Sequence, residues 1–227
     1  MLFNLLSGGS LEITSIIAYV FAMAFVVFCT LPIHEFAHAL VAYKLGDNTA
    51  KNMGRLTINP MAHIDWIGAL MILLVGFGYA KPVPVNARNF KKPKLGMALT
   101  ALAGPVSNII MALIFLLLNQ AISSFASGNV LLWRAIYTFF YFAAYVNVSL
   151  AVFNLIPIPP LDGSRVLSAV LPDKYYYKLM QYERYIVIGV FILLLTGVLS
   201  KPLSWVSGYL FSALDFIAAL PFGGLLG

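Results

Sequence analysis

The chain has 227 residues, of which 61% are hydrophobic and only 10% are charged, and its mean hydropathy is +0.91. This balance excludes an ordinary soluble domain, in which about 25% of residues are charged. The formal charge of +6 does not indicate nucleic-acid binding, because the basic residues lie beside apolar stretches, as in the cytoplasmic loops of membrane proteins.

Five apolar segments are predicted to span a membrane, since each meets or approaches the roughly 20 residues that a helix needs to cross the hydrocarbon core. A sixth stretch, Trp66 to Ala80, contains Gly68, Gly76 and Gly78, and as a helix it would reach only about 22 Å. We expect it to be re-entrant or partly inserted. The five segments are Leu11–Tyr43, Leu95–Leu118, Leu131–Phe153, Tyr185–Leu199 and Leu203–Leu220.

The predicted fold is therefore an all-α polytopic membrane protein with about five to six transmembrane helices. A re-entrant or extended segment lies between the first two main spans, and a proline-broken helix lies near Asp162. We expect one domain over residues 1–227, with a catalytic core at about 11–171 and C-terminal helices at about 185–220.

The distribution of basic residues predicts the topology. Lysines and arginines gather between Lys44 and Lys94 and again between Ser164 and Arg184, whereas Asn119 to Val130 contains no charged residue. Because positive charge marks cytoplasmic loops near span ends, both basic regions are predicted to be cytoplasmic. We expect a multi-pass protein of the cell membrane.

A metal-binding motif, His34-Glu35-Phe36-Ala37-His38, lies near the end of the first apolar helix. Residues i and i+4 share a helix face, so His34 and His38 can both turn a ring nitrogen toward one Zn²⁺ ion. Glu35 could take a proton from a zinc-bound water and pass it to the leaving amine. Chance produces this motif in about one such chain per thousand, so we predict a zinc site with Glu35 as the catalytic base.

The leading candidate for a third zinc ligand is Asp162, since catalytic zinc typically has three protein ligands plus water. Asp162 ends a proline-rich stretch from Asn154, and irregular backbone persists within a membrane only when it is buried in protein or lines a wet cavity. Asp162 and His34 would both lie about 15 Å below the cytoplasmic edge if the intervening segments are helical. His63 and Asp65 are rival ligands, although loop hydrogen bonding is their more common role.

Asn108 and Asn154 are amides within apolar spans. Hydrogen bonding between helices is the usual role of such residues. The functional alternative is that one or both bind the substrate backbone or stabilise the oxyanion, because attack on a peptide bond needs donors aimed at the developing charge.

Two further segments, Gly54 to Asp65 and Lys81 to Val85, carry prolines and alternating apolar residues that favour extended backbone at the membrane edge. An exposed strand edge there could bind an unwound substrate by strand addition.

These motifs resemble the site-2 protease family of intramembrane metalloproteases. The resemblance is carried by His34 to His38 and by Asn154 to Gly163, and it extends to Gly104 to Asn108 and to the segment from Gly54 to Asp65. It implies that His34, His38 and Asp162 bind one zinc ion per chain, that Glu35 is the base, and that the substrates are transmembrane proteins. The segment from Gly54 to Pro60, with His63 and Asp65, resembles the small bacterial and archaeal branch. The chain departs from many relatives in size, since we expect no room for an appended regulatory domain.

The predicted function is that of an intramembrane zinc metalloendopeptidase that works in the lipid bilayer with an active site nearer the cytoplasmic side. Regulation is then expected from earlier cleavage of the substrate, from a regulatory membrane partner or homo-oligomer, or from access between helices. Two alternatives use the same residues: a metal-transit protein, because ionisable groups within membranes also mark ion pathways, and a non-catalytic membrane chaperone that retains a zinc site.

Overall fold

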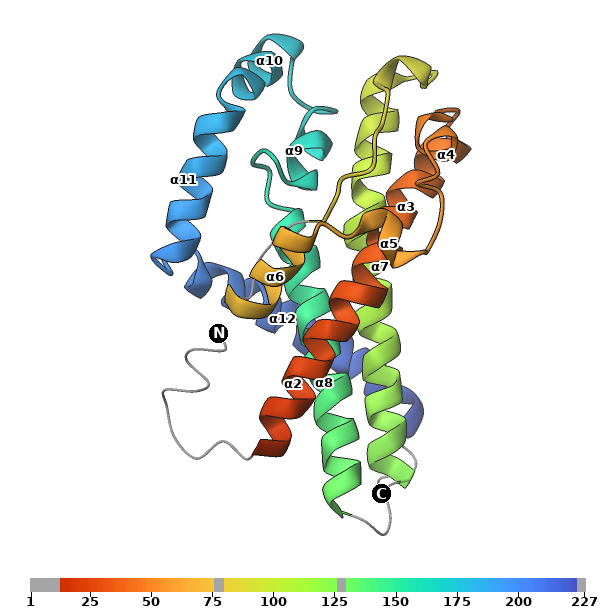
Figure 1. Ribbon diagram of the computed structural model, residues 1–227, viewed down its shortest axis with the longest axis vertical. Coiled ribbons are helices and arrows are strands. Elements are labelled where there is room, and N and C mark those ends of the chain that lie inside the picture. Colours follow the sequence, from red (N-terminus) through yellow and green to blue (C-terminus); the bar gives the residue numbers. More distant parts are fainter. Residues whose placement is uncertain (1–12, 76–79, 126–129, 224–227) are drawn as a thin grey trace.

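The computed structural model describes residues 13–75, 80–125 and 130–223. Within these ranges the chain forms helices joined by loops, and no β-strand occurs, which confirms the all-α prediction (Figure 1). The helices of the first half are α2 (Ile13–Phe25), η1 (Val26–Thr30), α3 (Leu31–Lys44), α4 (Thr49–Asn52), α5 (Pro60–His63), α6 (Trp66–Val75) and η2 (Ala87–Asn89). Those of the second half are α7 (Pro93–Phe125), α8 (Val130–Asn154), α9 (Asp162–Leu167), α10 (Asp173–Gln181), α11 (Glu183–Leu195), α12 (Ser200–Ala219) and η3 (Leu220–Phe222).

The first span is one continuous helix made of α2, η1 and α3, and it carries a π-helical turn just before the zinc motif. In η1 the N–H of Leu31 donates to the carbonyl of Val26, five residues earlier. Pro32 follows directly, and its missing N–H removes a donor from the normal ladder. This wider turn, of a kind frequent at functional sites, sets the direction in which α3 leaves the bundle.

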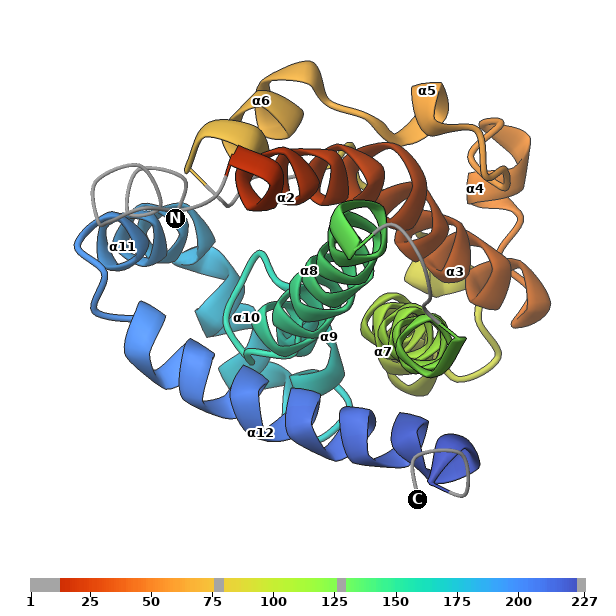
Figure 2. The same ribbon diagram turned by 90° about the horizontal axis from the view of Figure 1, so that it is seen from below.

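Helices α7 and α8 form the centre of the molecule, with α2 and α3 packed on one side and α12 running obliquely across the other (Figures 1 and 2). The core between them is built from small residues such as Ala112, Ala143 and Ala144, which let the helix backbones approach closely. Phe115 and Leu116 belong to the same core, and α3 packs along α7 beside it.

Four helices are long and apolar enough to cross a membrane: residues 17–44, 93–124, 131–154 and 200–222. They correspond to four of the five predicted spans. The fifth predicted span, Tyr185 to Leu199, forms α11 of 13 residues, which reaches about 20 Å against a hydrocarbon core of about 30 Å. Helix α11 stands apart from α8 at the edge of the molecule in both views (Figures 1 and 2).

The described part of the sixth apolar stretch forms α6, a helix of ten residues that contacts α2. Gly76 and Gly78, two glycines of this stretch, lie outside the described residues. The segment from Gly54 to Asp65 contains the short helix α5, and within the described residues neither it nor the segment from Lys81 to Val85 forms a strand.

Asp47 anchors the loops that follow α3 and that precede α7. This fully buried carboxylate accepts hydrogen bonds from the backbone and hydroxyl of Thr49, from the backbone N–H of Asn86 at 2.7 Å and from the side-chain amide of Asn89 at 2.7 Å. Burial alone would raise the pKa of Asp47, but these hydrogen bonds outweigh it and lower the pKa below its ordinary value. The extended segment from Lys81 to Asn86 is thereby fixed beside α3.

The predicted helix break before Asp162 is present. Helix α8 ends at Asn154, the proline-containing segment that follows is not helical, and α9 begins at Asp162. Because Pro157, Pro159 and Pro160 have no N–H to continue a helical ladder, the chain turns back toward α7 at this point.

Candidate metal centre

Three side chains that sequence reasoning placed together do meet in the structure. Nε2 of His34 lies 3.0 Å from Nε2 of His38, and Oδ2 of Asp162 lies 3.3 Å from each of these nitrogens. The two histidines are buried, and Asp162 is partly buried. Three potential ligand atoms thus form a nearly equilateral triangle inside the protein.

The size of this triangle fits zinc. Zn–N and Zn–O bonds of about 2.0–2.2 Å at tetrahedral angles place neighbouring ligand atoms about 3.3 Å apart. The observed separations of 3.0, 3.3 and 3.3 Å match one face of such a tetrahedron and leave the fourth position for water or substrate. Two imidazoles and one carboxylate are a typical donor set for catalytic zinc.

A backbone carbonyl on α7 fixes the orientation and the tautomer of His38. Nδ1 of His38 lies 2.7 Å from the carbonyl oxygen of Thr100. Because a carbonyl oxygen can only accept, Nδ1 must carry the hydrogen, and the lone pair of Nε2 is left to face Asp162. Such an outer contact is the usual support of a metal-binding histidine. Nδ1 of His34 is buried and has no comparable partner among the described residues.

Helix α7 approaches the metal centre through Gly104. A Cβ atom at this position would lie 2.5 Å from Nε2 of His34 and still closer to Nε2 of His38. Both distances are below the closest contacts that real Cβ atoms make. A glycine is therefore required here by the close approach of the α7 backbone to both ligand nitrogens.

Glu35 follows His34 on α3 and contacts an extended segment of the loop before α7. Its Oε2 accepts a hydrogen bond from the backbone N–H of Val83 at 3.1 Å, and the carboxylate is largely buried. The positive charge of Arg55 interacts with the negative charge of Glu35. Burial lowers the pKa of Arg55 below its ordinary value, and the charge of Glu35 partly opposes this shift.

The two candidate asparagines are in different situations. Asn108 lies one helical turn after Gly104 on the same face of α7, it is buried, and neither its amide nitrogen nor its oxygen has a partner among the described residues. The amide of Asn154 instead donates to the carbonyl of Leu150 in its own helix at 3.0 Å. Asn108 is therefore the amide with free hydrogen-bonding capacity, and Asn154 is engaged.

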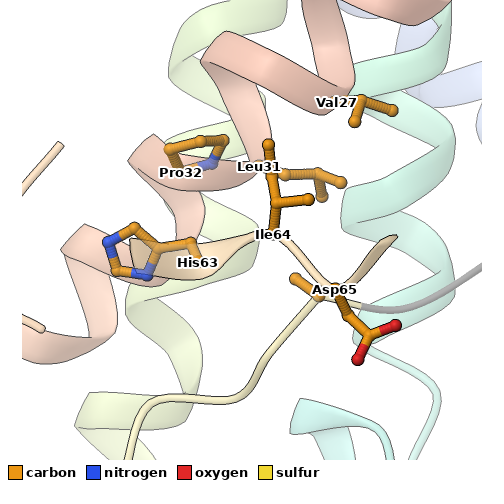
Figure 3. A pocket seen from close by; sticks show the side chains of 7 residues that line it. Val27, Leu31, Pro32, His63, Ile64 and Asp65 are labelled. Atoms are coloured by element: carbon orange, nitrogen blue, oxygen red, sulfur yellow. The ribbon is translucent and has the colours of Figure 1, made fainter. Parts of the chain in front are cut away.

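The rival ligands His63 and Asp65 do not join the cluster of His34, His38 and Asp162. Nε2 of His63 contacts the carbonyl oxygen of Thr57 at 2.7 Å, and the carboxylate of Asp65 accepts from the first N–H groups of α6. Their side chains point to different sides of a pocket beside α3 (Figure 3). Burial lowers the pKa of His63, the hydrogen bond to Thr57 opposes this shift, and the charge of Arg55 adds to it. Both residues act as loop hydrogen-bonders.

Sequence reasoning did not identify three contributors to the site: Thr100, Arg55 and Val83. The first contributes a backbone carbonyl and the last a backbone N–H, so side-chain chemistry gave no signal for either. For Arg55 the sequence does give a signal, because it lies in the segment from Gly54 to Asp65 that carries the resemblance, but the sequence does not show which carbonyls it binds.

Comparison with known proteins gives a consistent result. A family model described as peptidase family M50 matches residues 118–197, which include Asp162 but not His34 and His38. YwhC of Bacillus subtilis is 44% identical over 180 residues, covering 76% of this chain and 78% of its own. Rip2 of Mycolicibacterium smegmatis is 28% identical over 199 residues, covering 81% of this chain and 74% of its own.

A third relative, MJ0611 of Methanocaldococcus jannaschii, is 32% identical over 136 residues, covering 60% of this chain and 63% of its own. The names of all three relatives designate zinc metalloproteases. No solved structure matches the chain.

Proposed function

Because this chain belongs to peptidase family M50, the site-2 protease family, and is a zinc metalloprotease of that family, we propose that it hydrolyses peptide bonds of transmembrane proteins within or beside the bilayer. The observation that carries the proposal is the triangle of His34, His38 and Asp162 with Glu35 on the same helix. His34 and His38 lie on one of four span-capable helices of the described residues, which supports a membrane-embedded reaction.

We propose that His34, His38 and Asp162 hold the metal and that Glu35 is the base. Zinc bound there supplies the Lewis acid that activates water and polarises the scissile carbonyl. Glu35 then takes the proton of the attacking water and delivers it to the leaving amine, and its second carboxylate oxygen stays bound to the Val83 N–H. Asn108, with an unpartnered buried amide, is proposed to donate to the oxyanion of the substrate.

The distribution of charge supports a location for the reaction. Exposed basic side chains such as Lys51, Arg88 and Lys92 lie in the segments that follow α3, which carries the zinc motif, and precede α7. Since positively charged loops face the cytoplasm, we propose a cell-membrane protein whose site opens nearer the cytoplasmic side. Its partners would be transmembrane substrates in the surrounding bilayer, with a regulatory membrane protein or a second copy as a further partner.

The test is cleavage of a co-expressed, tagged panel of single-span membrane proteins by wild type and by Glu35→Gln, with the zinc content of both proteins measured. The proposal expects cleavage by wild type, no cleavage by the variant, and about one zinc per chain in both. If both bind zinc and neither cleaves any substrate, the proposal fails, and uptake of zinc into proteoliposomes then tests a transport role.

A further inference from the structure

The segment from Lys81 to Asn86, here called the proline segment, presents a single backbone donor to the site. Pro82 and Pro84 have no N–H, so Val83 carries the only N–H between Lys81 and Val85. A residue that precedes proline is restricted to extended backbone, which holds Val83 in an open conformation. Its N–H donates to Oε2 of Glu35 at 3.1 Å.

Arg55 holds the other side of the same peptide group. Its Nη2 donates to the carbonyl of Pro82 at 3.2 Å and also to the carbonyl of Lys81. The carbonyl of Pro82 and the N–H of Val83 belong to one planar trans peptide, so they point in opposite directions. Arg55 and Glu35 therefore bind the two ends of a single peptide group from opposite sides.

This arrangement couples Arg55 to Glu35 in two ways. A cation on the carbonyl of Pro82 polarises the peptide and strengthens the hydrogen bond that Val83 donates. It also fixes the tilt of the peptide plane, and with it the direction of the N–H. A buried arginine is costly unless it is well paired, and here the hydrogen bonds of the described structure direct its charge to these carbonyls.

We propose that Arg55 is a positioning residue for the proteolytic reaction: it holds the Pro82–Val83 peptide so that the Val83 N–H fixes one carboxylate oxygen of Glu35 and leaves the other free to take the proton. The inference rests on the proposed function, because it gives Arg55 a role only if Glu35 is the base. In this role Arg55 acts through the peptide, by its hydrogen bonds to the carbonyls of Lys81 and Pro82.

The test compares kcat, KM and zinc content of purified, zinc-loaded variants on a transmembrane peptide that wild type cleaves. Arg55→Gln removes the cation, and Val83→Pro removes the donor while remaining compatible with extended backbone. Each should lower kcat about 100-fold, the typical cost of a misplaced reacting group, with KM and zinc content unchanged. Arg55→Lys, which retains a cationic donor, should recover part of the loss.

A double-mutant cycle gives the sharpest result. If Arg55 acts only through the Val83 N–H, the variant with both Arg55→Gln and Val83→Pro has the kcat of the single variants rather than the product of their losses. Matched controls are Arg88→Gln, an exposed arginine in η2, and Val85→Pro, whose N–H has no partner in the described structure. Both controls should retain the wild-type kcat.

Three outcomes overturn the inference. In the first, Arg55→Gln cleaves at the wild-type rate. In the second, Arg55→Gln loses activity only because its zinc content falls or its KM rises. In the third, the kcat loss of the double variant equals the product of the losses of the two single variants. If wild type cleaves and Glu35→Gln does not, each of these outcomes rejects the role of Arg55 alone. If zinc-loaded wild type cleaves nothing, the proposed function itself fails, and the role of Arg55 fails with it.

Discussion

The backbone of Gly104 lies directly against the imidazole of His38, so closely that position 104 has no room for a side chain. The contact joins the middle of α7 to the zinc motif on α3. Because the neighbouring atoms are the proposed ligand nitrogens of His34 and His38, an added methyl group would displace the ligands or occupy the metal position.

Gly104→Ala is therefore expected to abolish zinc binding and cleavage together. The measurement is zinc per chain after purification, alongside cleavage of a transmembrane substrate. Gly208→Ala on α12 is the matched control, since a Cβ there would meet nothing within 4 Å, and it should keep both properties. A Gly104→Ala protein with full zinc content would contradict the described packing.

Asp162→Ala is expected to lower zinc affinity by more than about 100-fold, because the loss of a direct ligand exceeds the 10–100-fold typical of outer-shell contacts. Competition with a zinc-binding dye measures the change. Asp65→Ala should keep wild-type affinity, because that carboxylate accepts from the N–H groups of Ile67 and Gly68. The reverse pattern would assign the third ligand to Asp65.

Asn108→Leu is expected to separate stability from activity. Both polar atoms of Asn108 are buried and have no partner among the described residues, so an apolar side chain of similar volume should leave the unfolding temperature unchanged or raise it. If Asn108 stabilises the oxyanion, kcat should fall by about 10²–10³-fold. A stable Asn108→Leu variant with normal kcat would remove Asn108 from the mechanism.

Asp47→Ala is expected to destabilise the protein by about 2 kcal/mol at neutral pH. The substitution removes a buried carboxylate and leaves its donors on Thr49, Asn86 and Asn89 without their acceptor. The pKa of Asp47 is lowered in the folded state, so its stabilisation is fully present above the unfolded value of about 3.9 and declines as the pH falls below it.

Thermal unfolding in detergent at pH 7 and near pH 3 measures this effect. The difference in unfolding temperature between wild type and Asp47→Ala should shrink at the lower pH, whatever other carboxylates contribute to both proteins. A difference that is equal at both pH values would show that the hydrogen bonds of Asp47 do not depend on its charge.

The sequence alone determined the helical membrane class, four span-capable helices and the pairing of His34 with His38 in the candidate metal centre. Apolar length predicts a spanning helix because the bilayer sets a fixed thickness. The spacing of His34 and His38 fixes a shared helix face, and prolines before Asp162 require a break in the helix whatever the rest of the chain does. These are local consequences of covalent structure, so no distant contact can change them.

Only the tertiary structure decided among residues with equal local chemistry. Asn108 and Asn154 are the same amide in similar apolar helices. They differ because Asn154 donates to a carbonyl of its own helix, whereas Asn108 has no partner in the part of the chain that the structure describes. The choice of Asp162 over Asp65 likewise follows from the position to which each loop returns. The contact of Val83 with Glu35 uses a backbone N–H, which every residue except proline carries, so its partner depends only on how the chain folds.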